Sequence, residues 1–281
     1  MANPAENNVK NESPAQENKM GVMPVGKLLF TMSLPIMISM LVQALYNVVD
    51  SMFVARVSEN ALTALSMAFP IQNLMIAVST GLGVGLNAVL SRALGAKDEK
   101  GVNRAATNGI MLLFICGLVF MLGGATIVRP YFEMQTDIAE IVESGVDYTT
   151  IVMLGSMGIF MQILFERLLQ STGRTLLTMV SQGVGAIANI ILDPIFIFGL
   201  FGVPKMGVAG AAYATILGQW IAAAIGLVMN IRKNPEVSIS MKGFRPHGAT
   251  IRRILSIGIP SVVMQSIGSI MTFLMNQILI A

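Results

Sequence analysis

Charged side chains are scarce in this sequence: Asp, Glu, Lys and Arg make up 12% of its 281 residues, about half of their usual share. Hydrophobic residues account for 54%, and the mean hydropathy is +0.72. A soluble domain of this length needs charge to cover its surface. The balance therefore indicates that lipid is the solvent of this chain.

Cysteine and histidine are almost missing as well. The single cysteine, Cys116, excludes an internal disulfide and a thiolate metal cluster. The single histidine, His247, argues against a histidine-based metal site or a catalytic triad. We therefore expect a protein that is not an enzyme and that needs no cofactor.

Residues 1–24 are polar and lack the apolar core of a signal peptide, so they are interpreted as a disordered tail. Beyond them, seven stretches reach the roughly 20 apolar residues that a helix needs to cross a bilayer. The fold prediction is an all-α integral membrane protein. The stretches are residues 28–54, 61–90, 105–128, 146–170, 176–200, 208–231 and 251–281.

The basic residues are distributed unevenly among the loops between these stretches. If the tail is cytoplasmic, alternate loops place 15 of the 18 Lys and Arg residues on the inner side. This is the positive-inside pattern, and the acidic loop at 129–147 suits the outer face. We expect a multi-pass protein of the cell membrane, with a cytoplasmic N-terminus and lipid around it. The pattern accounts for the basic loops without a nucleic-acid partner.

An internal repeat is visible at the two ends of the hydrophobic region. Residues 27–35 (KLLFTMSLP) resemble 252–260 (RRILSIGIP), and residues 50–55 (DSMFVA) resemble 276–281 (NQILIA). Six spans separate the copies, so both cross the membrane in the same direction, as in transporters built from parallel repeats. The alternative is that seven spans are the whole protein.

The repeat predicts a domain division. Residues 25–231 form an N-terminal six-helix lobe, 232–250 a cytoplasmic inter-lobe linker, and 251–281 the first helix of a truncated C-terminal lobe. The complete protein would have about twelve helices. Without its repeat partners, the last helix is expected to attach loosely.

Two carboxylates lie well inside the predicted spans, Asp50 and Asp193. Charge within the hydrocarbon is costly, so each is a candidate functional group. Asp50 ends a stripe with Ser39, Gln43 and Asn47, whose spacings of four, four and three place them on one helix face. The alternative for Asp50 is that it caps its helix or meets interfacial water.

Helical rise brings polar groups of three spans to one depth. Asp50 and Asp193 lie roughly 7–10 Å below the outer ends of their helices. Asn189 precedes Asp193 by one turn, and Thr215 reaches the same level with Gln219 one turn below. Carboxylate, amide and hydroxyl oxygens suit H⁺, Na⁺ or a cationic substrate. The predicted site is Asp50, Asn189, Asp193 and Thr215, with Gln43, Asn47 and Gln219 as possible cavity lining and Na⁺ as the one metal ion considered.

Two further features have simpler interpretations. The glycines at 81, 83 and 85 lack the strand and the Lys-Ser/Thr of a phosphate loop, so they predict close helix packing. Glu166 and Arg167 are interpreted as an ion pair at the inner face, so Glu166→Gln is expected to have little effect.

Several segments resemble the multidrug and toxic compound extrusion family, and the similarity covers about 27–281. They are LP at 34–35, VDSMFVA at 49–55, LQSTG at 169–173, NIILDP at 189–194 and GAAYATILGQ at 210–219. The resemblance implies two six-helix lobes and efflux of cationic or amphipathic compounds such as drugs and dyes, driven by inward H⁺ or Na⁺. It also implies polar groups of the N-terminal lobe at Asp50, Asn189, Asp193 and Thr215. Most of the second lobe is missing, which puts autonomous transport in doubt.

Three other interpretations stay open. A flippase for lipid-linked precursors would share the architecture but needs a more cationic cavity to meet pyrophosphate. A non-functional truncated fragment would lack the second lobe. An intramembrane protease could use the two aspartates, but they lack a flanking motif.

The charge distribution predicts that the N-terminus and the loops at 91–104 and 232–250 are cytoplasmic. Single cysteines replace Ser58 or Asp98 in a Cys116→Ala background, and intact cells are treated with an impermeant maleimide. We expect labelling at position 58 and none at position 98. The reverse pattern would overturn this topology.

Overall fold

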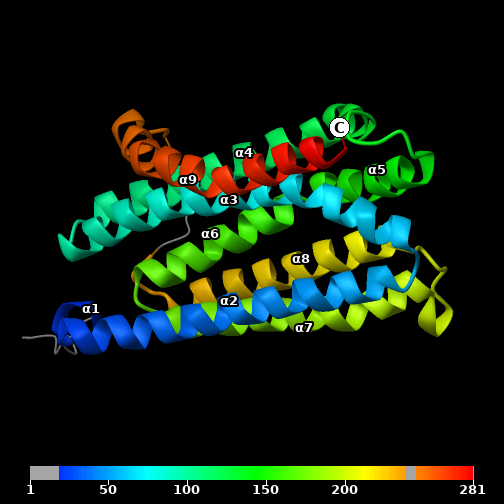
Figure 1. The fold of residues 1–281 in the computed structure, drawn as a ribbon. Helices are drawn as coiled ribbons and strands as arrows, with labels where there is room; N and C mark the ends of the chain where they lie inside the picture. The colour runs from blue at the N-terminus through cyan, green and yellow to red at the C-terminus, as the bar shows by residue number, and fades with distance from the viewer. Residues whose placement is uncertain (1–18, 238–244, 281) are drawn as a thin grey trace, which may run out of the picture.

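The computed structural model describes residues 19–237 and 245–280 (Figure 1), and within them the regular structure is entirely helical. The elements are α1 (Lys19–Val22), α2 (Val25–Ala55), α3 (Glu59–Gly95), α4 (Glu99–Glu133), α5 (Ala139–Leu154), α6 (Met157–Ser171), α7 (Thr175–Phe198), the 3₁₀ turn η1 (Leu200–Gly202), α8 (Val208–Lys233) and α9 (Gly248–Ile280).

The predicted spans are confirmed with one difference. Helices α2, α3, α4, α7, α8 and α9 are each long and apolar enough to cross a membrane. At the position of the remaining predicted span, where a single helix over 146–170 was expected, the structure has two helices, α5 and α6, which are long and apolar enough only together and are bent by 46°. With 37 residues, α3 is about 55 Å long, well beyond the roughly 30 Å of bilayer hydrocarbon.

Contacts with neighbouring helices explain the break between α5 and α6. The hydroxyl of Ser156 donates a hydrogen bond to the carbonyl of Gly117 in α4, at 3.1 Å. Gly155 lies so close to Ile216 of α8 that a Cβ atom would collide with that side chain. These contacts join residues far apart in sequence, so local pattern could not predict the bend.

Local sequence explains where several helices begin and end. Ser58 accepts a hydrogen bond from the backbone N–H of Ala61 and caps α3, and Asp98 accepts one from Gly101 and caps α4. Helix α7 ends at Gly199, whose φ of +76° is left-handed and favours glycine. Turn residues therefore separate the apolar stretches.

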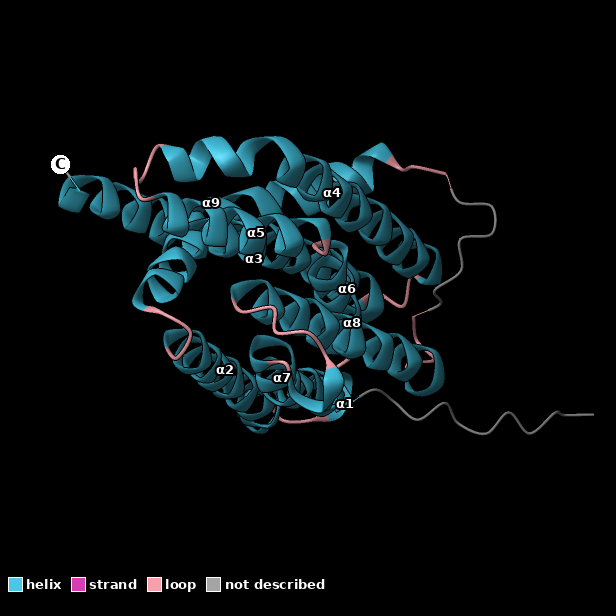
Figure 2. Ribbon diagram, turned by 90° about the vertical axis from the view of Figure 1, so that its right-hand side faces the viewer, coloured by secondary structure: helices cyan, strands magenta, loops and turns pink. Residues whose placement is uncertain are grey.

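The helices form two groups that are seen along the bundle in Figure 2. Helix α2 packs mainly on α7, which packs on α8, while α3 packs on α4, α5, α6 and α9. Helix α6 also packs on α8 and so joins the groups. Fully buried side chains fill the second group, including Leu86, Leu90, Phe160 and Leu164.

Helix α9 lies along α3 and runs in the same direction as α2 (Figure 1), as the internal repeat predicts. Gly81 and Gly85 of α3 allow this approach. A Cβ on Gly81 would lie 2.7 Å from the backbone nitrogen of Val262, and one on Gly85 would collide with the carbonyl oxygen of Ile254. The glycines therefore serve helix packing. Helix α9 was expected to attach loosely, whereas in the structure it packs closely on α3.

Several of the predicted domain boundaries fall on residues that the structure does not describe. Residues 1–18 of the expected disordered tail lie outside the described residues, and at Lys19–Val22 the structure instead has the short helix α1. The expected linker at 232–250 overlaps the end of α8 and the start of α9, and its residues 238–244 lie outside the description. Ala281 does so as well.

The α3–α9 contact predicts opposite effects of two glycine substitutions. Gly85→Ala forces backbone against backbone and should cost about 1–3 kcal/mol. Gly183→Ala, in α7, meets open space and should stabilise its helix by up to about 1 kcal/mol. Unfolding of the purified protein in mixed micelles measures both. Equal stability of the two variants would contradict the close packing.

Candidate intramembrane polar site

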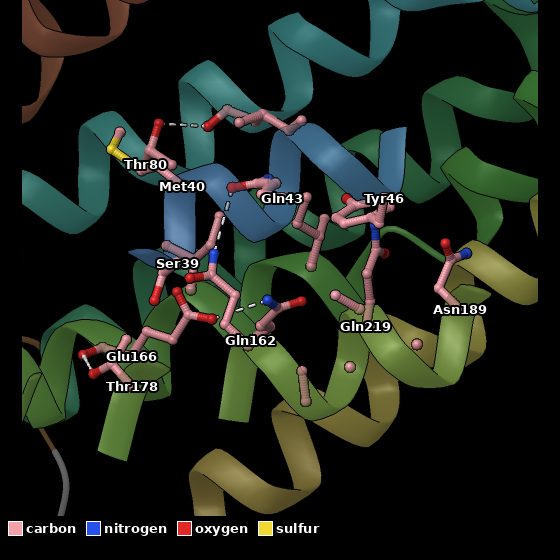
Figure 3. A pocket seen from close by; sticks show the side chains of 18 of the residues that line it. Ser39, Met40, Gln43, Tyr46, Thr80, Gln162, Glu166, Thr178, Asn189 and Gln219 are labelled. Atoms are coloured by element: carbon pink, nitrogen blue, oxygen red, sulfur yellow. Dashed lines mark hydrogen bonds between the residues drawn. The ribbon is translucent and has the colours of Figure 1, made fainter. Parts of the chain in front are cut away.

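A cavity of about 180 Å³ lies between α2, α6, α7 and α8, with α3 contributing to its wall (Figure 3). Polar side chains line much of it, although the surrounding helices are apolar. They are Ser39, Gln43, Tyr46, Thr80, Gln162, Glu166, Arg167, Gln170, Thr178, Gln182, Asn189, Thr215 and Gln219. The cavity is thus a polar site within a membrane-spanning bundle.

One face of α2 supplies its share of the site. Ser39, Gln43 and Tyr46 line the cavity, and Asp50 is 6% exposed. Asn47 is exposed and outside the lining, so the predicted lining does not include it. Three residues turn a helix by about 300°, which rotates Asn47 about 60° away from Asp50. Tyr46 takes the inward position.

Helices α7 and α8 supply the other half and approach closely beside it. The side-chain amide of Asn189 donates to Asp193 Oδ1 and to Thr215 Oγ1, each at 3.4 Å. A Cβ on Gly218 would lie 2.9 Å from the carbonyl oxygen of Gly185. The two glycines therefore bring α7 and α8 together next to Asn189.

The two aspartates are neighbours across the α2–α7 contact. Asp193 has no exposed surface, and Asp50 is close enough for the two carboxylates to interact electrostatically. Both lie outside the cavity lining, although Asp193 is hydrogen-bonded to Asn189, which forms part of it. No ion pair joins either of them to Lys or Arg in the part of the chain that the structure describes.

Buried oxygen acceptors accumulate at this point without enough donors. Asp50 Oδ1, Asp193 Oδ2 and Asn189 Oδ1 are all buried and lack a hydrogen-bond partner among the described residues. A buried acceptor without a donor costs about 1–3 kcal/mol. Oxygen atoms that converge without a positive partner favour a proton or a small hard cation. His, Cys, Asp and Glu form no group of three for a metal within the described ranges.

The structure thus brings the four predicted site residues together. Asp50, Asn189, Asp193 and Thr215 form one cluster, and Gln43 and Gln219 line the adjoining cavity. The depth estimate from helical rise is sufficient to identify this cluster, because the three helices involved, α2, α7 and α8, are continuous through it.

Sequence reasoning missed two tyrosines at the site. Tyr46 lines the cavity. Its spacing of four residues from Asp50, which places both on one helix face, could have indicated this position. Tyr148 of α5 is 1% exposed, and its hydroxyl accepts a hydrogen bond from Gln72 at 2.8 Å. Both tyrosines lie within electrostatic reach of Asp50. Nothing in the sequence pattern indicated Tyr148, because its position depends on how α5 packs on α3.

The expected ion pair of Glu166 with Arg167 is wrong. No contact within 4 Å joins their charged groups among the ion pairs of the described residues. Consecutive residues of a helix point about 100° apart, so the two side chains diverge. Glu166 is 6% exposed and lines the cavity.

Buried carboxylates and amides inside a bundle of apolar, membrane-spanning helices are typical of ion-coupled transporters. A sequence model of the MatE family matches residues 35–195, more than half of the chain, and the chain belongs to this family. It is a multi-pass membrane protein of a family of transporters rather than enzymes.

Curated relatives cover the chain almost completely. The probable multidrug resistance protein NorM of Thermotoga maritima is 29% identical over 259 residues, which cover 90% of this chain and 54% of that protein. The multidrug export protein MepA of Staphylococcus haemolyticus is 29% identical over 243 residues, which cover 85% and 52%. The chain therefore spans about half the length of the curated relatives it matches.

Solved structures agree with the fold. A MOP superfamily transporter from Pyrococcus furiosus, described as having a binding pocket of reverse polarity, gives a TM-score of 0.79 at 30% identity over 85% of this chain and 52% of that one. An inward-facing multidrug resistance MATE family transporter gives 0.77 at 30% identity over 88% and 55%. The predicted family and fold class are confirmed.

The unsatisfied acceptors predict that Asp193→Asn stabilises the folded bundle. The change removes one of two neighbouring buried carboxylates and supplies N–H donors beside Asn189 Oδ1, which lacks one. We expect the free energy of unfolding at neutral pH to rise by about 1–3 kcal/mol. Thermal unfolding in detergent, with Glu99→Gln as an exposed control, measures it. A lower midpoint than that of the unmodified protein would contradict this account of the site.

Proposed function

We propose that this chain forms one lobe of an efflux transporter that exports cationic or amphipathic organic compounds in exchange for inward-moving H⁺ or Na⁺. The observation that supports this function is the pair of carboxylates, Asp50 and Asp193, buried among apolar helices beside a polar cavity. Such groups mark ion pathways in membrane proteins because their burial is costly. The multidrug resistance and export proteins among the relatives support the substrate class.

In this proposal Asp193 is the coupling carboxylate and Asp50 its partner. Asn189 and Thr215, which are hydrogen-bonded to each other, hold the adjoining oxygen atoms in place. A proton or Na⁺ bound here and a cationic substrate compete for the same negative charge. Competition of this kind couples the inward movement of one to the outward movement of the other, because each ligand favours a different state.

The proposal includes a second lobe, because the chain spans about half the length of its relatives. In transporters built from repeats, the substrate binds at the interface between them. The cavity in this lobe is smaller than the roughly 300 Å³ at which ligand pockets begin, so it suits the coupling ion. The protein would lie in the plasma membrane with its N-terminus in the cytoplasm, as the basic loops favour.

A flippase for lipid-linked precursors is less well supported. It would need several cationic groups for a pyrophosphate, whereas Arg167 is the one Lys or Arg that lines the cavity among the residues described.

The test is efflux of ethidium from cells that express the chain together with the second lobe its relatives carry. Asp193→Asn should abolish energised efflux, and Asp50→Asn should reduce it at least about tenfold, because each removes charge that the coupling ion needs. Expression in the membrane, measured by immunoblot, should stay normal.

Glu99→Gln is the matched control, since Glu99 is an exposed carboxylate in the first turn of α4. It should leave efflux unchanged. If Asp193→Asn still pumps at the unmodified rate under a proton or sodium gradient, the coupling site lies elsewhere.

A further inference from the structure

The polar cavity is lined by a carboxylate of its own, in addition to the Asp50–Asp193 pair that lies beside it. Glu166 of α6 is buried and lines the same cavity as Asn189 and Thr215 (Figure 3). Its Oε1 accepts a hydrogen bond from the side-chain amide of Gln162 at 2.9 Å, and its backbone carbonyl accepts one from the hydroxyl of Thr178 at 3.5 Å. The carboxylate is therefore held inside the bundle, against the cavity.

The neighbouring cation does not pair with it. Arg167 lies against α3, where a Cβ on Gly83 would be 2.9 Å from its Cγ, and its Nη1 donates to Gln170 Oε1 at 2.7 Å. Its charge acts on Glu166 through space, but no ion pair joins them among the described residues. The inner end of the cavity thus holds a carboxylate without a bonded counter-charge.

The rise along α7 gives the separation between Glu166 and the Asp50–Asp193 pair. Thr178 contacts Glu166, and Asn189 contacts Asp193. Eleven residues of continuous helix separate Thr178 from Asn189, a rise of about 16 Å. The Glu166 end and the Asp50–Asp193 pair are therefore too far apart to share one ion, and the cavity that Glu166 lines extends to Asn189, which contacts Asp193.

Polar side chains lie along the space between these ends. Gln182 of α7 donates to Gln43 of α2 at 3.4 Å, and Tyr46 lines the same cavity. The hydroxyl of Tyr46 lies within electrostatic reach of all three carboxylates, Asp50, Asp193 and Glu166. Figure 3 shows Gln43, Tyr46 and Gln162 around the same space.

The size of the cavity decides what can occupy it. A volume of about 180 Å³ is large enough to hold several water molecules. It is too small for a drug-sized compound. Water and a small cation fit both the volume and the polar lining.

We infer that Glu166 is a second cation-binding carboxylate, which holds a proton or Na⁺ that has left the Asp50–Asp193 pair before it reaches the cytoplasmic side. The inference rests on the proposed function, since it extends the path of the coupling ion toward the end of the bundle that carries the basic loops. A proton leaves the Asp193 carboxyl, passes through cavity water and is taken up by the Glu166 carboxylate. Relays of acidic residues serve ion pathways in this way.

The first test uses the purified 281-residue chain and needs no transport. Dicyclohexylcarbodiimide adds to protonated carboxyl groups in apolar surroundings, and mass spectrometry locates the adduct. We expect Glu166 to be modified and the exposed Glu99 to remain unmodified. If the ion is H⁺, modification falls as the pH rises and is the same in NaCl and choline chloride; if it is Na⁺, NaCl protects Glu166. An unmodified Glu166, or modification indifferent to both pH and Na⁺, would overturn the inference.

The second test separates an ionic role from a structural one. Glu166→Gln keeps an oxygen that can accept the hydrogen bond from Gln162, so a purely structural role predicts efflux at the unmodified rate. The ionic role predicts a loss of at least about tenfold in gradient-driven efflux, with ethidium binding unchanged and partial rescue by Glu166→Asp. Glu99→Gln is the control, because it removes an exposed carboxylate, in the first turn of α4, that does not line the cavity.

The two proposals fail in different ways. If Asp193→Asn and the unmodified protein export equally, the coupling site assigned to Asp193 in the proposed function is wrong, and carbodiimide labelling still decides whether Glu166 binds a cation. If Asp193→Asn abolishes efflux while Glu166→Gln exports normally, the coupling site stands and the inference about Glu166 is wrong.

Discussion

The absence of a counter-charge for carboxylates buried in an apolar bundle is the constraint on which the rest of this structure depends. Asp50 and Asp193 are buried without an ion pair among the described residues, and one oxygen atom of each, together with Asn189 Oδ1, lacks a donor. Such an arrangement is unfavourable for stability, because each unsatisfied group costs free energy. Proteins retain sites of this kind where a ligand supplies the missing interaction.

The packing around the site keeps these groups in place. Gly185 and Gly218 bring the backbones of α7 and α8 into contact beside Asn189, and the α5–α6 pair, bent near Gly155, packs on both α3 and α8. Small residues replace the hydrophobic effect as the means of helix association in lipid, because close backbone approach increases van der Waals contact. The polar groups therefore face a rigid wall rather than a loop.

Much of this organisation could be predicted from the sequence, because membrane helices are long, apolar and regularly spaced. Six spans and the position of the α5–α6 pair were predicted, and helical rise alone indicated that Asp50, Asn189, Asp193 and Thr215 lie at a similar level. The depth argument works because a bilayer aligns its helices, so that position along the chain translates into height.

The remaining features depend on rotation and on long-range contacts, which spacing does not specify. Asn47 lies about 60° from Asp50 around α2 and faces outward. Glu166 and Arg167 are adjacent in sequence and diverge in space, so the expected ion pair does not form. The break after Leu154 requires Gly117 and Ile216, which belong to other helices. A single sequence carries no record of these partners.

The length of α3 has a consequence for how the protein sits in its membrane. A helix of 37 residues exceeds the hydrocarbon thickness even at a tilt of about 40°, so apolar length alone leaves its vertical position undetermined. The corner between α3 and α4 carries Arg92, Lys97, Lys100 and Arg104, and anionic headgroups attract such a cluster by about 1 kcal/mol for each charge. This basic corner therefore stays at the level of the lipid headgroups. Charges on another pair of helices thereby affect the depth of the buried carboxylates below the lipid surface, and this depth should vary with the content of anionic headgroups in the membrane.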